Sequence, residues 1–140
     1  MRDNLDPYDL LALSMKEKAL QISQASQPSA QSGKVKAWSG KNYIVVFEYS
    51  GKDSYLARFW TNDKNMIFDE TYYPGMRLTE AVNALDDEGS QYDNVYTVGG
   101  NKQVVEFGIR GANISYIEFI QADIMIPDKI QKLLNKYENN

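Results

Sequence analysis

The side chains that could do chemistry in this sequence are carboxylates, tyrosines and a few basic groups, because the chain contains neither histidine nor cysteine. This composition excludes Ser-His and Cys-His nucleophile pairs, cysteine-ligated metals and disulfides. It also removes the one side chain whose ordinary pKa lies near neutrality. The sequence therefore favours a protein without catalytic residues, metal or cofactor.

Carboxylates are concentrated in the middle of the chain. Between residues 69 and 93, seven acidic residues accompany one arginine, a net charge of 1 − 7 = −6 in a chain whose total is −4. A surface of one sign attracts oppositely charged partners, although a solvated helix end that only keeps a protein soluble has the same pattern. The predicted surface for a basic partner comprises Asp69, Glu70, Tyr72, Tyr73, Glu80, Asp86, Asp87, Glu88, Tyr92 and Asp93.

Among the carboxylates in predicted strands, Glu118 is the one that strand alternation predicts to be buried. Strand alternation places it on the same side as Tyr116 and Ile120, within a strongly apolar segment. A glutamate enclosed in an apolar pocket has a raised pKa and can act as an acid or a base. Arg58, Tyr116 and Glu118 therefore form a possible polar pocket.

Metal and nucleic acid are not expected ligands. The run Asp86-Asp87-Glu88-Gly89 lacks the alternating ligand spacing of a calcium loop. Ten tyrosines and two tryptophans exceed what a small core needs, and aromatic sheet faces suit protein recognition. Stacking of single-stranded bases also requires a basic track for phosphates, which a chain of pI about 4.8 does not offer.

The first element is a helix predicted over residues 6–23. Asp6 is a capping carboxylate and Pro7 suits the first turn. The helix has two apolar ridges, and the ridge of Leu10, Leu13 and Leu20 packs either on its own domain or on a partner chain in a homodimer. The polar, aperiodic stretch 24–34 predicts a flexible linker to a core at 35–140.

Hairpin-like spacing of Val, Ile, Tyr and Phe runs predicts the remaining elements. Strands are expected at 35–38, 43–49, 54–61, 66–73, 93–98, 103–109 and 114–122, with a helix at 77–87 and another from Pro127. The fold class is therefore α+β, with antiparallel β-meanders of about seven strands and N-terminal, central and C-terminal helices in a single domain, 1–140. The two sheet-plus-helix halves are rough structural counterparts. Whether the strands form one sheet or two stays open.

The element order and acidic pI resemble those of small secretion chaperones, and the halves resemble some immunity proteins that neutralise nuclease toxins; both resemblances cover element order alone. We expect a non-catalytic inhibitor, immunity or chaperone protein that binds a basic partner such as a toxin or secreted effector. The alternatives are a small-ligand pocket or histidine-free enzyme, and an oligomeric structural subunit. No apolar run approaches the roughly 20 residues of a membrane span, so a cytoplasmic location without membrane contact is expected.

Overall fold

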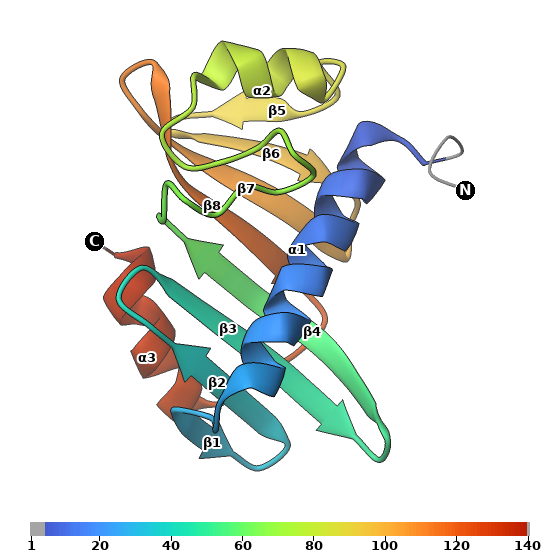
Figure 1. Cartoon of the computed structure of the whole chain (residues 1–140), viewed down its shortest axis with the longest axis vertical. Coiled ribbons are helices and arrows are strands. Elements are labelled where there is room, and N and C mark those ends of the chain that lie inside the picture. The colour runs from blue at the N-terminus through green and yellow to red at the C-terminus, as the bar shows by residue number, and fades with distance from the viewer. Residues whose placement is uncertain (1–4, 140) are drawn as a thin grey trace.

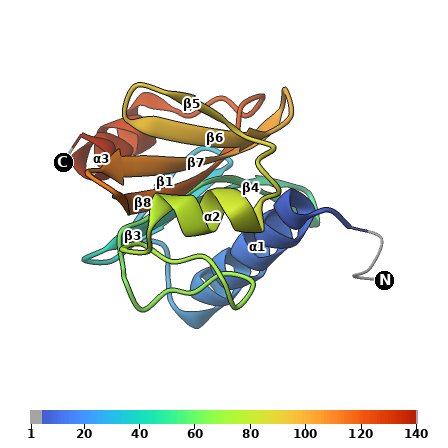
Figure 2. The same ribbon diagram turned by 90° about the horizontal axis from the view of Figure 1, so that it is seen from above.

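The computed structural model describes residues 5–139, which form one eight-stranded antiparallel sheet and three α-helices. The elements are α1 (Pro7–Ala25), β1 (Ala30–Ser32), β2 (Val35–Ser39), β3 (Tyr43–Ser50), β4 (Asp53–Thr61), α2 (Leu78–Ala84), β5 (Ser90–Tyr92), β6 (Val95–Gly99), β7 (Gln103–Arg110), β8 (Asn113–Gln121) and α3 (Asp128–Glu138). Helices α1 and α2 lie on one face of the sheet and α3 lies on the other (Figures 1 and 2). The α+β prediction is confirmed, with eight strands in place of about seven.

The sheet consists of two copies of one four-stranded meander. Adding 60 to the bounds of β1 to β4 gives the bounds of β5 to β8. Strand pairing repeats with the same offset: Val35 pairs with Glu48 and Val95 with Gly108. Few residues are identical at this spacing, and Val35 and Val95, Val45 and Val105, Phe47 and Phe107, and Phe59 and Phe119 are among them. The expected structural counterparts are thus two halves of a single sheet.

The two halves meet where β4 pairs with β8. This seam joins Arg58 to Ile120, Phe59 to Phe119, Trp60 to Glu118 and Thr61 to Ile117. Phe59 and Phe119 occupy equivalent positions of the two copies and lie opposite each other, so a pseudo-two-fold axis passes between them. Both rings are fully buried. The strand order β1-β2-β3-β4-β8-β7-β6-β5 follows from this head-to-head joining.

Each face of the sheet has its own core. The α1 and α2 side buries Trp38, Phe47, Phe59, Phe107 and Phe119 with Leu11 and Met15 of α1. The other side buries Val35, Ile44, Val46 and Trp60 under Ile130 and Leu134 of α3. Helix α3 packs mainly on β1 to β3 of the first half, and its last turn also reaches Arg58 and Trp60 of β4.

Helix α1 begins as its sequence predicts and docks on its own sheet. The Asp6 side chain accepts a hydrogen bond of 2.8 Å from the Asp9 backbone N–H, which satisfies a free donor of the first turn. Contacts of α1 with β3 and β4 place its apolar ridge on the core.

Two parts of the predicted organisation are wrong. Residues 24–34 are not a featureless flexible linker, because they include the end of α1 and the edge strand β1. The Trp38 indole N–H donates to the Ser26 carbonyl at 3.0 Å, and this contact ties the connection to β2. Residues 66–73 do not form a strand; Phe68 and Tyr72 instead close a short loop through two mutual backbone hydrogen bonds.

Gly108 lies in β7 at a position where the packing of the second half leaves no room for a side chain. A Cβ there would lie 2.0 Å from Cε2 of Tyr116, whose ring is also stacked on Trp60. We expect Gly108→Ala to destabilise the protein by about 1–3 kcal/mol, because the confined ring must move. Gly100→Ala, with nothing within 4 Å of its Cβ, is the matched control and should change stability little. Urea unfolding measures both, and equal midpoints for the two variants would contradict the argument.

Candidate functional site

The predicted polar pocket residues Arg58, Tyr116 and Glu118 come together on the α3 side of the seam. Arg58 Nη1 lies 2.7 Å from Glu138 Oε2 of α3 and 3.5 Å from Glu118 Oε2 of β8. The Tyr116 hydroxyl donates to Glu106 Oε2 of β7 at 2.5 Å. Three carboxylates, one guanidinium and one phenol thus form a connected cluster across β4, β7, β8 and α3, which we call the seam cluster.

Glu118 is the buried centre of the seam cluster, with 3% of its surface exposed. As a carboxylate its Oε2 has no hydrogen-bond donor, because Arg58 lies closer to Glu138. Burial first, and then a hydrogen bond to Glu138, raise the pKa of Glu118 from 4.5 to about 10, although Arg58 opposes the shift. Burial therefore favours the neutral carboxylic acid form of Glu118 at neutral pH.

The surroundings of the seam cluster are aromatic. Trp60 lies directly opposite Glu118 in the seam and is stacked on Tyr116 at 5.9 Å between ring centroids, with Tyr137 on another side at 5.6 Å. Tyr137 donates to the Gly40 carbonyl at 2.6 Å, which fixes the end of α3. Burial and the hydrogen bond to Glu106 raise the pKa of Tyr116 above its ordinary value. The cluster holds a proton within packed side chains, which suits fastening α3 to the seam.

The enzyme alternative would be favoured by a closed apolar cavity that contains Glu118. The three pockets described within residues 5–139 are lined by other residues. Glu118 and Arg58 therefore have the chemistry expected of a polar pocket but are packed against each other and α3.

The predicted partner-binding carboxylates are mostly exposed. Asp86, Asp87 and Glu88 follow α2, and Asp93 lies in the turn between β5 and β6; all four are exposed, as are Glu70 and Glu80. Within residues 5–139, none of these six forms an ion pair with a lysine or arginine. Asp69 is half-buried in the 62–77 loop, and its backbone N–H donates to the Ser14 hydroxyl at 2.8 Å.

The structure brings some of these carboxylates together around two tyrosines. Burial and then the charges of Asp69 and Asp86 raise the pKa of Tyr72 to about 12. Burial is also the main cause that raises the pKa of Tyr96, with smaller contributions from Asp87 and Glu88. The 62–77 loop and the end of α2 therefore lie side by side at this end of the molecule.

The tyrosine part of the predicted surface requires correction. Tyr72 is 2% exposed and packs in the α1 and α2 core, where its ring lies 6.2 Å from that of Phe107. Tyr73 is half-buried against the same core. Tyr92, in contrast, is 86% exposed on the edge strand β5. Core packing uses most of the tyrosine surplus, and the hydroxyls of Tyr96, Tyr116 and Tyr137 form hydrogen bonds from largely apolar sites.

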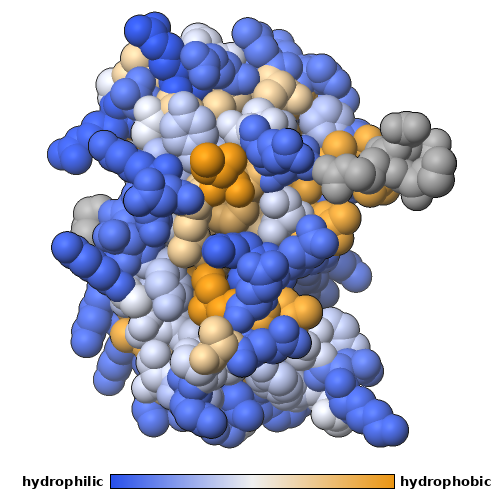
Figure 3. All heavy atoms as spheres, viewed as in Figure 1, coloured by the Kyte–Doolittle hydropathy of each residue, from blue (hydrophilic) through white to orange (hydrophobic). Residues whose placement is uncertain are grey.

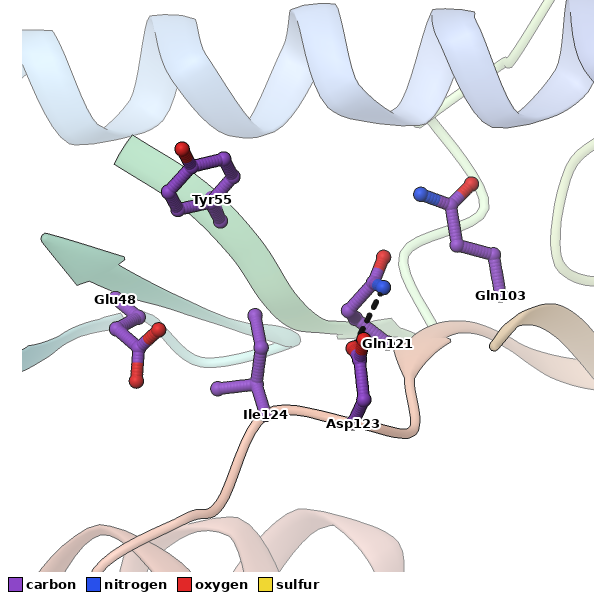
Figure 4. A pocket seen from close by; sticks show the side chains of 6 residues that line it. All are labelled: Glu48, Tyr55, Gln103, Gln121, Asp123 and Ile124. Atoms are coloured by element: carbon purple, nitrogen blue, oxygen red, sulfur yellow. Dashed lines mark hydrogen bonds between the residues drawn. The ribbon is translucent and has the colours of Figure 1, made fainter. Parts of the chain in front are cut away.

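A polar cleft opens where the start of β4 diverges from the end of β8 (Figure 4). It has a volume of about 360 Å³ and is lined by Glu48, Tyr55, Gln103, Gln121, Asp123 and Ile124. Its two carboxylates do not act as a pair, because Ile124 lies between Glu48 and Asp123 in Figure 4. Asp123 instead accepts a hydrogen bond of 2.7 Å from Gln121. We call this the acidic cleft.

The second ridge of α1 faces outward. Leu13 is 40% and Leu20 43% exposed, and Ile67 of the neighbouring loop is 58% exposed. Figure 3 shows apolar side chains on this face in small patches between polar ones. A homodimer through this ridge stays a prediction.

Two further features were sought in the part of the chain that the structure describes: clusters of metal-binding side chains and helices that could cross a membrane. Residues 5–139 contain no group of three Asp or Glu side chains placed to hold a metal ion. None of the described helices combines the length and the apolar character that crossing a membrane requires.

Comparison with protein-family models, with curated proteins and with solved structures finds no match to this chain.

Sequence reasoning missed Glu106 and Glu138 as members of the seam cluster. A register shift between Gly108 and Ile109 places Glu106 opposite Glu118, whereas a regular hairpin from the Arg110–Asn113 pair would place Val105 there. Glu138 follows Tyr137 near the end of an amphipathic helix, a position that favours solvent by pattern alone. No local signal indicates either contact.

Glu118→Gln tests the proton held in the seam cluster. Because the folded pKa is raised above the unfolded one, the stability that this proton confers is complete below about pH 4.5 and is lost as pH rises toward about 10. The variant keeps a neutral side chain at all pH values. We expect it to lose about 2 kcal/mol less stability than wild type between pH 6 and pH 9, on the scale of an unsatisfied buried charge.

Denaturant unfolding at several pH values measures this difference, with the exposed Glu17→Gln as the control that should follow wild type. Parallel stability curves for wild type and Glu118→Gln would show that Glu118 is ionised throughout.

Proposed function

We propose that this chain is a non-catalytic binding protein that engages a basic protein through the carboxylates beyond α2. We define the acidic end as Asp86, Asp87, Glu88 and Asp93. An inhibitor, immunity or chaperone protein for a toxin or secreted effector, acting in the cytoplasm, is the class that fits such a surface. The main support comes from comparing the two halves of the repeat, because a charge that is present in one half alone is not required by the fold that both halves share.

The first half of the molecule is an internal control for the acidic end. Residues 26–34 connect α1 to its first hairpin at the position where residues 86–94 connect α2 to the equivalent hairpin, and the strand pairing repeats with a shift of 60. Residues 26–34 contain one lysine and no acid, a charge of +1, whereas residues 86–94 contain four acids and no base, a charge of −4. The turn before β2 contains Gly33 in the conformation that Asp93 has before β6, so this turn does not require a carboxylate. The chain leaves the two helices differently, because Ser26 is extended with a φ of −155° whereas Asp86 and Asp87 are left-handed.

Backbone conformation makes the acidic end more costly than its counterpart. Asp86, Asp87 and Asp93 have φ angles of 55°, 57° and 55°, in the left-handed region. The position equivalent to Asp93 is Gly33, with a φ of 57°. A residue with a side chain loses stability in this region relative to glycine, by roughly 1 kcal/mol. Aspartate adopts this region more readily than most residues, but glycine and asparagine do so at least as well, so the backbone alone does not account for three negative charges here.

The physical action of such a surface is long-range attraction. Four exposed carboxylates without a cationic partner among residues 5–139 produce a field that guides a basic protein toward this end. Tyr92, 86% exposed between them on β5, offers apolar contact area once the partner has docked. In this proposal, electrostatic attraction speeds association, and contact with Tyr92 slows dissociation.

The triple variant Asp86→Asn, Asp87→Asn and Glu88→Gln tests this proposal. Its folding should change little, since all three side chains are exposed. Association with the basic partner should slow by about tenfold at low salt and lose most of its dependence on ionic strength. The partner is first captured from cells of the source organism on the immobilised wild-type chain, identified and purified, and association rates are then measured from about 0.02 to about 0.2 M salt.

The matched control removes three other exposed carboxylates, Glu17, Asp53 and Asp123, which gives the same total charge. It should bind with nearly wild-type kinetics and salt dependence. Identical association rates for the triple variant and wild type, or a captured partner that is itself acidic, would overturn the proposal.

A further inference from the structure

The two ends of the seam form a pair of clefts related by the internal repeat. Pairing between β4 and β8 is confined to four residues of each strand, so the strands diverge on either side. The acidic cleft lies at one end, and a second cleft of about 320 Å³ lies at the other, between the end of β4 and the start of β8. Tyr55 and Ser115, and likewise Ile124 and Lys64, are counterparts at the 60-residue spacing in the two linings.

The two clefts have opposite charge. Glu48 and Asp123 line the first, whereas Lys64 and Arg110 line the second. Asn62, Asn113 and Ser115 add hydrogen-bonding groups to the second lining, which contains no carboxylate although the chain has 19 acidic residues and 15 basic ones. We call it the basic cleft. Because the two clefts lie at equivalent ends of the seam, the β4–β8 pairing itself does not dictate either charge.

The aliphatic part of the Lys64 side chain packs on Gly75. The Cγ and Cδ atoms of Lys64 lie 3.5 Å from where a Cβ on residue 75 would be, so its stem rests on the glycine. Gly75 has a φ of 102°, which a residue with a side chain rarely adopts, and its N–H donates to the Ile114 carbonyl at 2.7 Å. This contact ties the 74–76 segment to the start of β8 and places the lysine beside the cleft.

Neither cation is neutralised within the structure. Across residues 5–139, Lys64 and Arg110 form no ion pair. Arg110 is the last residue of β7 and pairs with Asn113, while Lys64 follows β4, so the two charges approach the cleft from different elements. The floor is apolar, with Pro74 and Ile114 both buried.

We propose that the basic cleft binds the phosphate group of a small phosphorylated molecule. Guanidinium, ammonium, amide and hydroxyl donors from several directions suit a doubly charged oxyanion with many acceptor positions. The volume of about 320 Å³ leaves room for an organic portion against Pro74 and Ile114. Exposure of the lysine and arginine limits the strength, and the dissociation constant is expected at roughly 1 mM.

Titration of the ¹⁵N-labelled protein followed by NMR at constant ionic strength tests this site. The probes are inorganic phosphate, glucose 6-phosphate and acetate. Saturable shifts of the amides of residues 62–64, 75 and 110–115 are expected with both phosphates, whereas acetate should bind at least tenfold more weakly. Tighter binding of glucose 6-phosphate assigns the site to phosphate esters, and equal affinity assigns it to free phosphate.

The variant Lys64→Gln/Arg110→Gln should weaken phosphate binding at least tenfold. Both side chains are exposed, so an unchanged amide spectrum elsewhere verifies folding. Lys52→Gln/Lys102→Gln is the control, since both lysines are exposed in hairpin turns and neither lines the cleft, and it should bind like wild type. Shifts that follow all surface lysines, affinity for acetate equal to that for phosphate, or full binding by the first variant would overturn the proposal.

Discussion

The pairing of β4 with β8 is the interaction on which this molecule depends. Four residue pairs join the two halves into one sheet, and the buried rings of Phe59 and Phe119 lie at their centre. The α1 side of this seam is part of the main core, and its other side carries the seam cluster. Both clefts exist because the pairing ends where it does. Fold and candidate sites therefore share one origin.

The repeat explains why charge can differ so strongly between equivalent places. Backbone geometry in each half is fixed by strand register, three hairpin turns and a few apolar positions such as Phe47 and Phe107. Surface residues at the helix connection and in the clefts do not contribute to that register, so they can change without loss of the sheet. The acidic end is more negative than the equivalent segment of the first half, and the basic cleft is more positive than the acidic cleft at the other end of the seam.

Much of the fold follows from sequence pattern, because apolar alternation and glycine-containing turns act locally. The central strands of both meanders, the antiparallel pairing and the helix stripes are all of this type. Strands β1 and β5 were not predicted because each has three residues and no apolar alternation, Ala-Gln-Ser and Ser-Gln-Tyr, and each forms mainly through pairing with β2 or β6. The false strand at 66–73 has the opposite cause: Phe68 and Tyr72 are apolar for core packing, while Asp69 and Glu70 turn the backbone between them with left-handed φ angles of 50° and 56°.

The candidate site was predictable only in part. Burial of Glu118 follows from its apolar strand, but its neighbours depend on register shifts near Phe47 and Ile109, which alternation does not reveal. The 60-residue spacing was the available signal for one sheet. It remained weak because buried positions keep apolar character without keeping identity, as at Ile44 and Val104.

Arg58 and Glu118 show why it is favourable for the two halves to have different sequences near the axis. They are equivalent positions of the repeat, and the axis between Phe59 and Phe119 brings them to 3.5 Å of each other. A symmetric dimer of one half would place identical residues at these positions, and two arginines or two ionised glutamates there would repel in a site of low dielectric. Joining both halves in one chain permits opposite charges across the axis. The Glu138 carboxylate from α3, which has no counterpart in the first half, then competes for the same arginine and leaves Glu118 with its proton.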